Sequence, residues 1–143
     1  MTIFTDFEIQ LLEFQLKRIR VGIFLLYIVI VLWITLIDRE WGKSHAMLIP
    51  FWEFANVIKG VERSFYIKQI LGNLTMLLPF GFMLPMLKKV TLKQVLLISM
   101  LFSVFIEVLQ FITGRGLMEF DDVFNNTAGA VLGYIIYSKL RRK

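Results

Sequence analysis

Four long runs of apolar residues dominate the sequence, and short polar segments separate them. The runs occupy about residues 20–37, 70–87, 92–112 and 121–138. A helix that crosses the hydrocarbon core of a bilayer needs about 20 apolar residues, so each run is long enough for one span. The fourth run is the least hydrophobic, because it opens with Asp121 and Asp122 and contains Asn125 and Asn126. The pattern predicts an all-α membrane protein with four transmembrane helices.

Two further stretches have the spacing of amphipathic helices. In the N-terminal stretch, apolar residues recur at intervals of 3, 4 and 3: Phe4, Phe7, Leu11 and Phe14. We interpret it as an interfacial helix, either separate from the first span or continuous with it. A helix of a soluble core, or one that binds a partner, is the alternative. A second stripe predicts another interfacial helix, which caps the bundle and leaves Glu53 off its apolar face: Phe51, Phe54, Ile58, Val61 and Phe65.

Composition supports a membrane protein and excludes some site chemistry. The 143 residues are 57% hydrophobic and 19% charged, with a mean hydropathy of +0.71. Soluble domains are about half apolar and about a quarter charged. Because the sequence has no cysteine, thiol catalysis and thiolate metal sites are excluded. The length fits one domain over residues 1–143.

The distribution of Lys and Arg predicts the orientation of the four spans. Ten of the 16 basic residues fall in segments that share one side if all four runs cross: Lys17, Arg18, Arg20, Lys88, Lys89, Lys93, Lys139, Arg141, Arg142 and Lys143. Cytoplasmic segments are enriched in Lys and Arg near span ends, so we expect both termini to be cytoplasmic. The net charge of +5 is then a consequence of topology, and no nucleic-acid partner is indicated.

Polar side chains from three of the runs are predicted to share one depth near the outer surface. With a rise of about 1.5 Å per residue, Glu107 and Asn126 lie about 7 Å below the outer ends of their spans, and Asn73 lies about 5 Å below. Helical spacing gives the third and fourth runs one stripe each: Ser103, Glu107, Gln110 and Gly114, and Asp122, Asn126, Gly129 and Gly133. The two last glycines form a GxxxG pair that allows close helix packing. We expect the two stripes to face each other.

This convergence defines a candidate ligand-binding site: Asn73, Glu107, Gln110, Arg115, Asp121, Asp122 and Asn126. Carboxylates are the ligands that Mg²⁺ and Ca²⁺ prefer, so the candidate metal ligands are Glu119, Asp121 and Asp122. Arg115 offers a donor fork for phosphate or carboxylate. Glu107 is the candidate general base, because partial desolvation makes a carboxylate a better proton acceptor. No recognised catalytic motif is present, so the catalytic interpretation is the weaker one.

Each of these residues also has a purely structural interpretation. Asp121 and Asp122 stand where a helix N-terminus accepts anionic caps. Gln110 and Asn126 could make hydrogen bonds between helices. Glu107 could pair with Arg115, which lies closer to the surface. The outer site and the structural network are therefore both open.

Several motifs resemble the VanZ-like family of small bacterial membrane proteins. They are LIPF (Leu48 to Phe51), GNLTMLLPFGFMLP (Gly72 to Pro85), EVLQ (Glu107 to Gln110) and GRGLMEFDDVFNNTAGAVLGY (Gly114 to Tyr134). The family pattern falls on these positions: Asn73, Pro79, Gly81, Glu107, Gln110, Arg115, Asp121, Asp122, Asn126, Gly129 and Gly133. The chain departs from the pattern at Glu119, where the family has an aspartate, and in a link that is one residue longer.

The resemblance implies a protein of the bacterial plasma membrane with a role in low-level resistance to glycopeptide antibiotics of the teicoplanin type. One hypothesis is a binding protein whose outer site takes a lipid-linked cell-wall precursor or a lipoglycopeptide. The other is an enzyme that modifies a lipid-linked envelope precursor with a divalent metal. A transporter is disfavoured because the polar groups do not continue to the inner side. Membrane lipids are expected partners, and the oligomeric state is left open.

Overall fold

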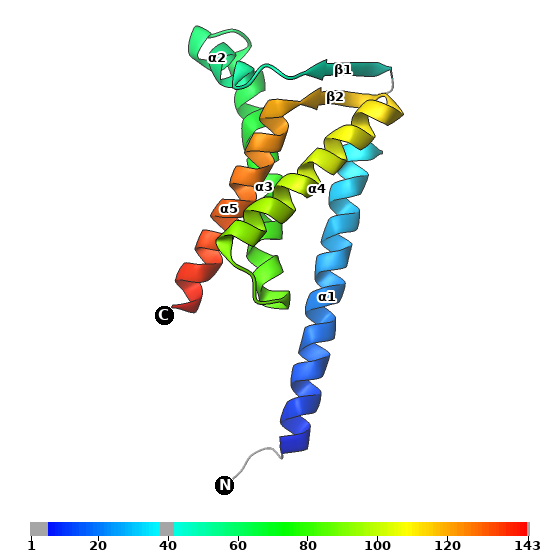
Figure 1. The fold of residues 1–143 in the computed structure, drawn as a ribbon, viewed down its shortest axis with the longest axis vertical. Helices are drawn as coiled ribbons and strands as arrows, with labels where there is room; N and C mark the ends of the chain where they lie inside the picture. Colours follow the sequence, from blue (N-terminus) through cyan, green and yellow to red (C-terminus); the bar gives the residue numbers. More distant parts are fainter. Residues whose placement is uncertain (1–5, 38–41, 143) are drawn as a thin grey trace.

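The computed structural model describes residues 6–37 and 42–142, and most of them are helical (Figure 1). In chain order the elements are α1 (Asp6–Leu36), β1 (Lys43–Met47), α2 (Trp52–Lys59), α3 (Arg63–Leu87), α4 (Leu92–Thr113), β2 (Arg115–Glu119) and α5 (Phe120–Arg141). Helices α1 and α4 run toward the end of the molecule that carries α2 and the strands, and α3 and α5 run away from it (Figure 1). The start of α1 and the end of α5 therefore lie at the opposite end.

Three helices of the described chain are long and apolar enough to cross a membrane: Phe7–Leu36, Arg63–Leu87 and Leu92–Thr113. They cover the first three predicted spans except for Ile37, which follows the end of α1. The fourth predicted span forms a helix, α5, but does not belong to this group. Two aspartates open α5 and basic residues close it, which lowers its hydropathy.

The distribution of polar side chains across the fold also indicates a membrane protein. Among the described residues, 12 buried side chains are polar or charged and 7 are hydrophobic. Large apolar side chains are instead exposed along all four long helices. Water would not stabilise such an arrangement, whereas a bilayer would cover the apolar exterior and favour a hydrogen-bonded interior.

Helix α1 joins the predicted amphipathic helix to the first span without a break, which was one of the two expected arrangements. Phe4 lies outside the described residues. Most of α1 is exposed, and only its last third contributes buried residues, Val31 and Thr35. The Tyr27 hydroxyl donates to the Met76 carbonyl oxygen of α3 at 2.6 Å, so a hydrogen bond fixes α1 against the bundle.

The predicted capping helix between residues 51 and 65 is divided in two. Helix α2 ends at Lys59 because Gly60 adopts a left-handed conformation with φ of 76°, a common helix stop. Ile58 is 85% exposed, so the predicted apolar stripe does not become a buried face. The one buried residue within α2 is Glu53, which the sequence placed off that stripe.

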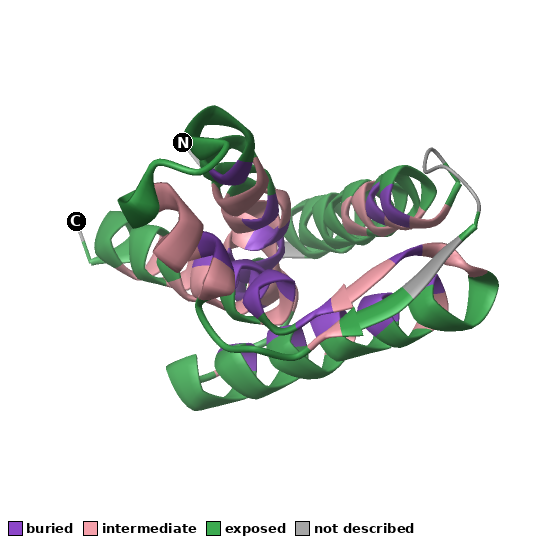
Figure 2. Cartoon of the chain, turned by 90° about the horizontal axis from the view of Figure 1, so that it is seen from above, coloured by how far each residue is buried: buried purple, intermediate pink, exposed green. Residues whose placement is uncertain are grey.

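A short parallel sheet is the main departure from the predicted all-α fold. Strands β1 and β2 pair in register, from Lys43 with Arg115 to Met47 with Glu119. The sequence predicts only polar links at these positions. Extended links leave backbone N–H and C=O groups without partners, and pairing between the two links satisfies them. The sheet packs on α4 (Figure 2), and β2 leads directly into the first turn of α5.

Glycines bring α3 and α5 into backbone contact. A Cβ added at Gly129 would lie 1.9 Å from the carbonyl oxygen of Leu74, and one added at Gly133 would lie 2.0 Å from that of Leu78. Gly81 of α3 approaches the backbone of α5 in the same way. The GxxxG pair thus permits close packing as predicted, but its partner is α3 and not the helix of the third run.

Candidate functional site

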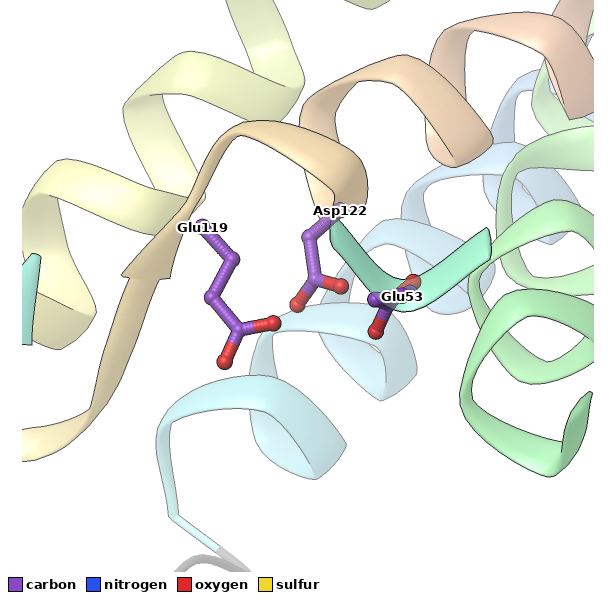
Figure 3. A group of neighbouring side chains, drawn as sticks. All are labelled: Glu53, Glu119 and Asp122. Atoms are coloured by element: carbon purple, nitrogen blue, oxygen red, sulfur yellow. The ribbon is translucent and has the colours of Figure 1, made fainter. Parts of the chain in front are cut away.

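Three acidic side chains from three elements meet at the end of the bundle that carries the sheet. Glu53 comes from the first turn of α2, Glu119 from the end of β2, and Asp122 from the first turn of α5 (Figure 3). One carboxylate oxygen from each lies within 4.8 Å of the others. All three residues are at most 4% exposed. Such a group combines high negative charge with little water, so it requires a compensating partner or protonation.

The carboxylate of Asp121 positions Glu53. Its two oxygens accept the backbone N–H groups of Phe51 at 2.5 Å and of Glu53 at 2.9 Å. These donors are at the N-terminus of α2, where N–H groups lack partners within the helix and a negative charge is favourable. Asp121 therefore caps α2 from α5, and the bend before α2 is fixed by Phe51 in a left-handed conformation with φ of 60°.

Each member of the acidic group accepts a hydrogen bond from a side-chain carboxamide. Asn125 donates to Glu53 at 3.1 Å. Gln69 donates to Glu119 at 2.9 Å. Asn73 donates to Asp122. The carboxamides are neutral, so they orient the carboxylates and leave the negative charge in place.

The surroundings of Glu53 disfavour the ionised form of its carboxyl group. Burial, followed by the nearby charges of Asp122, Glu119 and Asp121, raises the pKa of Glu53 to about 8, against the smaller opposing effect of the Asn125 hydrogen bond. Its second oxygen, Oε1, is buried and has no hydrogen-bond partner. A buried carboxylate oxygen without a donor is rare in proteins. Near neutral pH this oxygen favours either a proton or a cation.

The remaining predicted site residues tie this group to the rest of the bundle. Glu107, 2% exposed, accepts the backbone N–H of Glu119 at 3.0 Å and so holds the end of β2. Gln110 donates to the carbonyl oxygen of Thr35 at 2.9 Å, and Arg115 donates to that of Leu36 at 2.7 Å. These two side chains bind the C-terminal end of α1.

Asn126 lies at the contact between α4 and α5. It donates to the Ser103 hydroxyl oxygen at 2.9 Å, so the two predicted stripes do meet at this pair. Its own Oδ1 is buried without a partner, as is Oε1 of Gln110. The predicted residues therefore divide into the acidic group with its Asn73 donor, the Asp121 cap of α2, and four residues that bridge neighbouring elements: Glu107, Gln110, Arg115 and Asn126.

Three residues of the site were not predicted as site residues from the sequence: Glu53, Gln69 and Asn125. Asn125 and Gln69 lie next to, or one turn from, residues that were selected, and helical spacing alone could have found them. Glu53 gave a weaker signal, an acidic residue shortly after the LIPF motif. Of the predicted metal ligands, Glu119 and Asp122 belong to the acidic group. The oxygens of Asp121 accept backbone N–H groups.

Comparison with known proteins shows which family the sequence of this chain matches. A family model described as VanZ/LLP1 matches residues 24–141, which include every residue of the acidic group and its carboxamide donors. No curated protein and no solved structure matches the chain.

Proposed function

Because the chain belongs to the VanZ/LLP1 family, we propose that it is a multi-pass protein of a bacterial plasma membrane that contributes to low-level resistance to teicoplanin-type glycopeptides. In this proposal the polar site at the α2 and sheet end binds a lipid-linked cell-wall precursor or a lipoglycopeptide. The observation that carries it is the set of three buried carboxylates, each held by a carboxamide, at one end of membrane-length helices.

The proposal includes four spans with both termini in the cytoplasm. The alternating direction of the four long helices supports it (Figure 1). The basic residues that follow α3 and end α5 lie at the end of the bundle away from the acidic site, as the positive-inside rule requires. Contact with α3 along the glycines of α5 would shield the less hydrophobic fourth span from lipid. The acidic site would then face the outside.

An inhibition assay tests the proposed role. A susceptible bacterium expressing the full chain should grow at a higher teicoplanin concentration than the empty-vector strain. Glu107→Gln removes the acceptor charge under β2, and Asp122→Asn removes one carboxylate of the acidic group. We expect both changes to abolish protection while immunoblots of membranes show normal amounts of protein. Glu62→Gln, at an exposed position before α3, is the matched control and should protect fully.

Two results would oppose the proposal. Absence of protection by the unchanged protein would remove the resistance role. Full protection by both Glu107→Gln and Asp122→Asn would leave the resistance role but separate it from the acidic site.

The second candidate function is an enzyme that modifies a lipid-linked envelope precursor. The observation that favours it is the spacing of the three acidic oxygens, which suits a divalent ion. Such an ion could bridge the carboxylates to a precursor phosphate. Incubating purified protein and Mg²⁺ or Ca²⁺ with an extracted lipid-linked precursor tests this candidate. A new lipid species in the mass spectrum, absent with EDTA, is the expected result, and an unchanged spectrum would remove it.

A further inference from the structure

We propose that Glu53, Glu119 and Asp122 bind a Ca²⁺ ion, which neutralises the site and fixes α2 to the end of the bundle. The proposal rests on the acidic site of the proposed function and specifies its ligand chemistry. Glu119 and Asp122 were predicted as metal ligands from the sequence, and the proposal adds Glu53 from the first half of the chain.

The number and burial of the carboxylates favour Ca²⁺ over Mg²⁺. Ca²⁺ binds oxygen at about 2.3–2.6 Å, so ligand oxygens on opposite sides of the ion are at most about 5 Å apart. Mg²⁺ loses its waters reluctantly, so it usually keeps several of them and is bound through one or two carboxylates. The oxygens of the acidic group lie within 4.8 Å of one another. This spacing is within the reach of Ca²⁺. All three carboxylate residues are at most 4% exposed, which favours an ion that takes most of its oxygens from the protein over one that keeps its waters.

The unpartnered oxygen of Glu53 indicates that a ligand belongs at this point. Oε1 is buried without a hydrogen-bond partner, on a residue with 0% exposure. The Glu53 carboxylate lies close to those of Glu119 and Asp122 (Figure 3). A cation at the centre of the group would give this oxygen a partner and would offset the repulsion among the three carboxylates.

The surrounding carboxamides match the outer shell of a metal site. Metal-ligating carboxylates are themselves hydrogen-bonded in most sites, because the outer partners fix their orientation. Here Asn125, Gln69 and Asn73 each donate to one of the three ligands. The backbone of Glu53 is held in addition by the Asp121 cap. Two residues of α5, Asp121 and Asn125, therefore support the position of Glu53.

Tb³⁺ luminescence tests the proposal, because Tb³⁺ binds at Ca²⁺ sites in proteins. The measurement uses the full chain in detergent micelles at pH 7. Trp52 adjoins Glu53 in the sequence and can sensitise a bound Tb³⁺. We expect Tb³⁺ emission when tryptophan is excited. Millimolar Ca²⁺ should displace the bound Tb³⁺ and so reduce this emission, whereas Mg²⁺ at the same concentration should be at least tenfold less effective. Glu53→Gln should weaken Ca²⁺ binding at least tenfold, whereas the control Glu62→Gln should leave it unchanged.

A second measurement does not depend on any variant. In the unchanged protein, 5 mM Ca²⁺ should raise the melting temperature relative to EDTA, because an ion that binds only the folded state stabilises it. No Ca²⁺-displaceable emission and no shift in the melting temperature would overturn the proposal. A melting temperature that responds to acidification but not to Ca²⁺ would also overturn it, since a proton would then neutralise the site.

These results are separable from the proposed function. A protein that protects cells against teicoplanin but binds no Ca²⁺ contradicts only the ion site. A protein that binds Ca²⁺ and gives no protection contradicts only the resistance role.

Discussion

The contact between α3 and α5 gives a quantitative test of the fold that holds the site. Gly129→Ala would place a Cβ 1.9 Å from the Leu74 carbonyl oxygen. That position is about 1.5 Å short of the 3.4 Å at which ordinary van der Waals contact begins. The atom in the way belongs to the backbone, so no side-chain rotation relieves the clash and the two helices must separate.

Separating the helices has an energetic and a local consequence. Overpacking of this kind costs about 1–3 kcal/mol, which corresponds to a melting temperature lower by roughly 3–10 °C for a chain of this size. Asn73, which donates to Asp122, directly precedes Leu74 on α3. We therefore expect Gly129→Ala to weaken the acidic site together with the fold.

Gly72→Ala is the matched control for this substitution. Gly72 also lies in α3, but nothing lies within 4 Å of a Cβ added there. Since Ala is favoured over Gly in a helix by up to about 1 kcal/mol, this variant should melt at or above the temperature of the unchanged protein. Thermal melts of the purified proteins in one detergent provide the comparison. Equal melting temperatures for Gly129→Ala and Gly72→Ala would refute the backbone-contact argument.

Further predictions concern the charges of the site. In EDTA, the proton that burial places on Glu53 stabilises the fold fully below the unfolded pKa of 4.5, and this stability is lost as the pH rises through about 8. The melting temperature should fall across that window, and Glu53→Gln should flatten the profile; parallel profiles for the two proteins would exclude Glu53 as the titrating group. Asp121→Asn replaces one accepting oxygen with a donor, so it should lower the free energy that holds α2 against α5 by about 1.5–3 kcal/mol. Helix α2 should then detach more often. Limited proteolysis after Lys59 should then be faster than in the unchanged protein, and equal cleavage rates would argue against the cap.

Local sequence pattern was sufficient to predict the long helices. The third run, residues 92–112, corresponds to α4 (Leu92–Thr113), and the fourth, residues 121–138, lies within α5 (Phe120–Arg141). Apolar runs of this length have few alternatives to a helix in a membrane. The strands were not predictable in the same way, because segments of five residues carry no signal for a partner more than 70 positions away.

The site was predictable only where it depends on depth within the helices. Estimating depth from helix rise placed Asn73 near the level of Glu107 and Asn126. The structure joins Asn73 to Asp122, one turn before Asn126. Glu53 could not be found by this reasoning, because its position depends on how a short surface helix folds over the bundle. Local pattern also suggested Asp121 as a cap of its own helix. Its carboxylate caps α2 instead, a contact 68–70 residues away that only the tertiary fold creates.

The parallel pairing of β1 with β2 has a consequence for the order of synthesis. Strand β1 and α2 follow the first helix, while β2 and α5 follow the fourth, so the first group leaves the ribosome well before its partners. Until α5 has been made, Glu53 lacks the Asp121 cap and the Asn125 donor. The N-terminal half must therefore remain with this segment unassembled until α5 has been made. Packing of α5 against α3 then completes the bundle and its acidic site in the same late event.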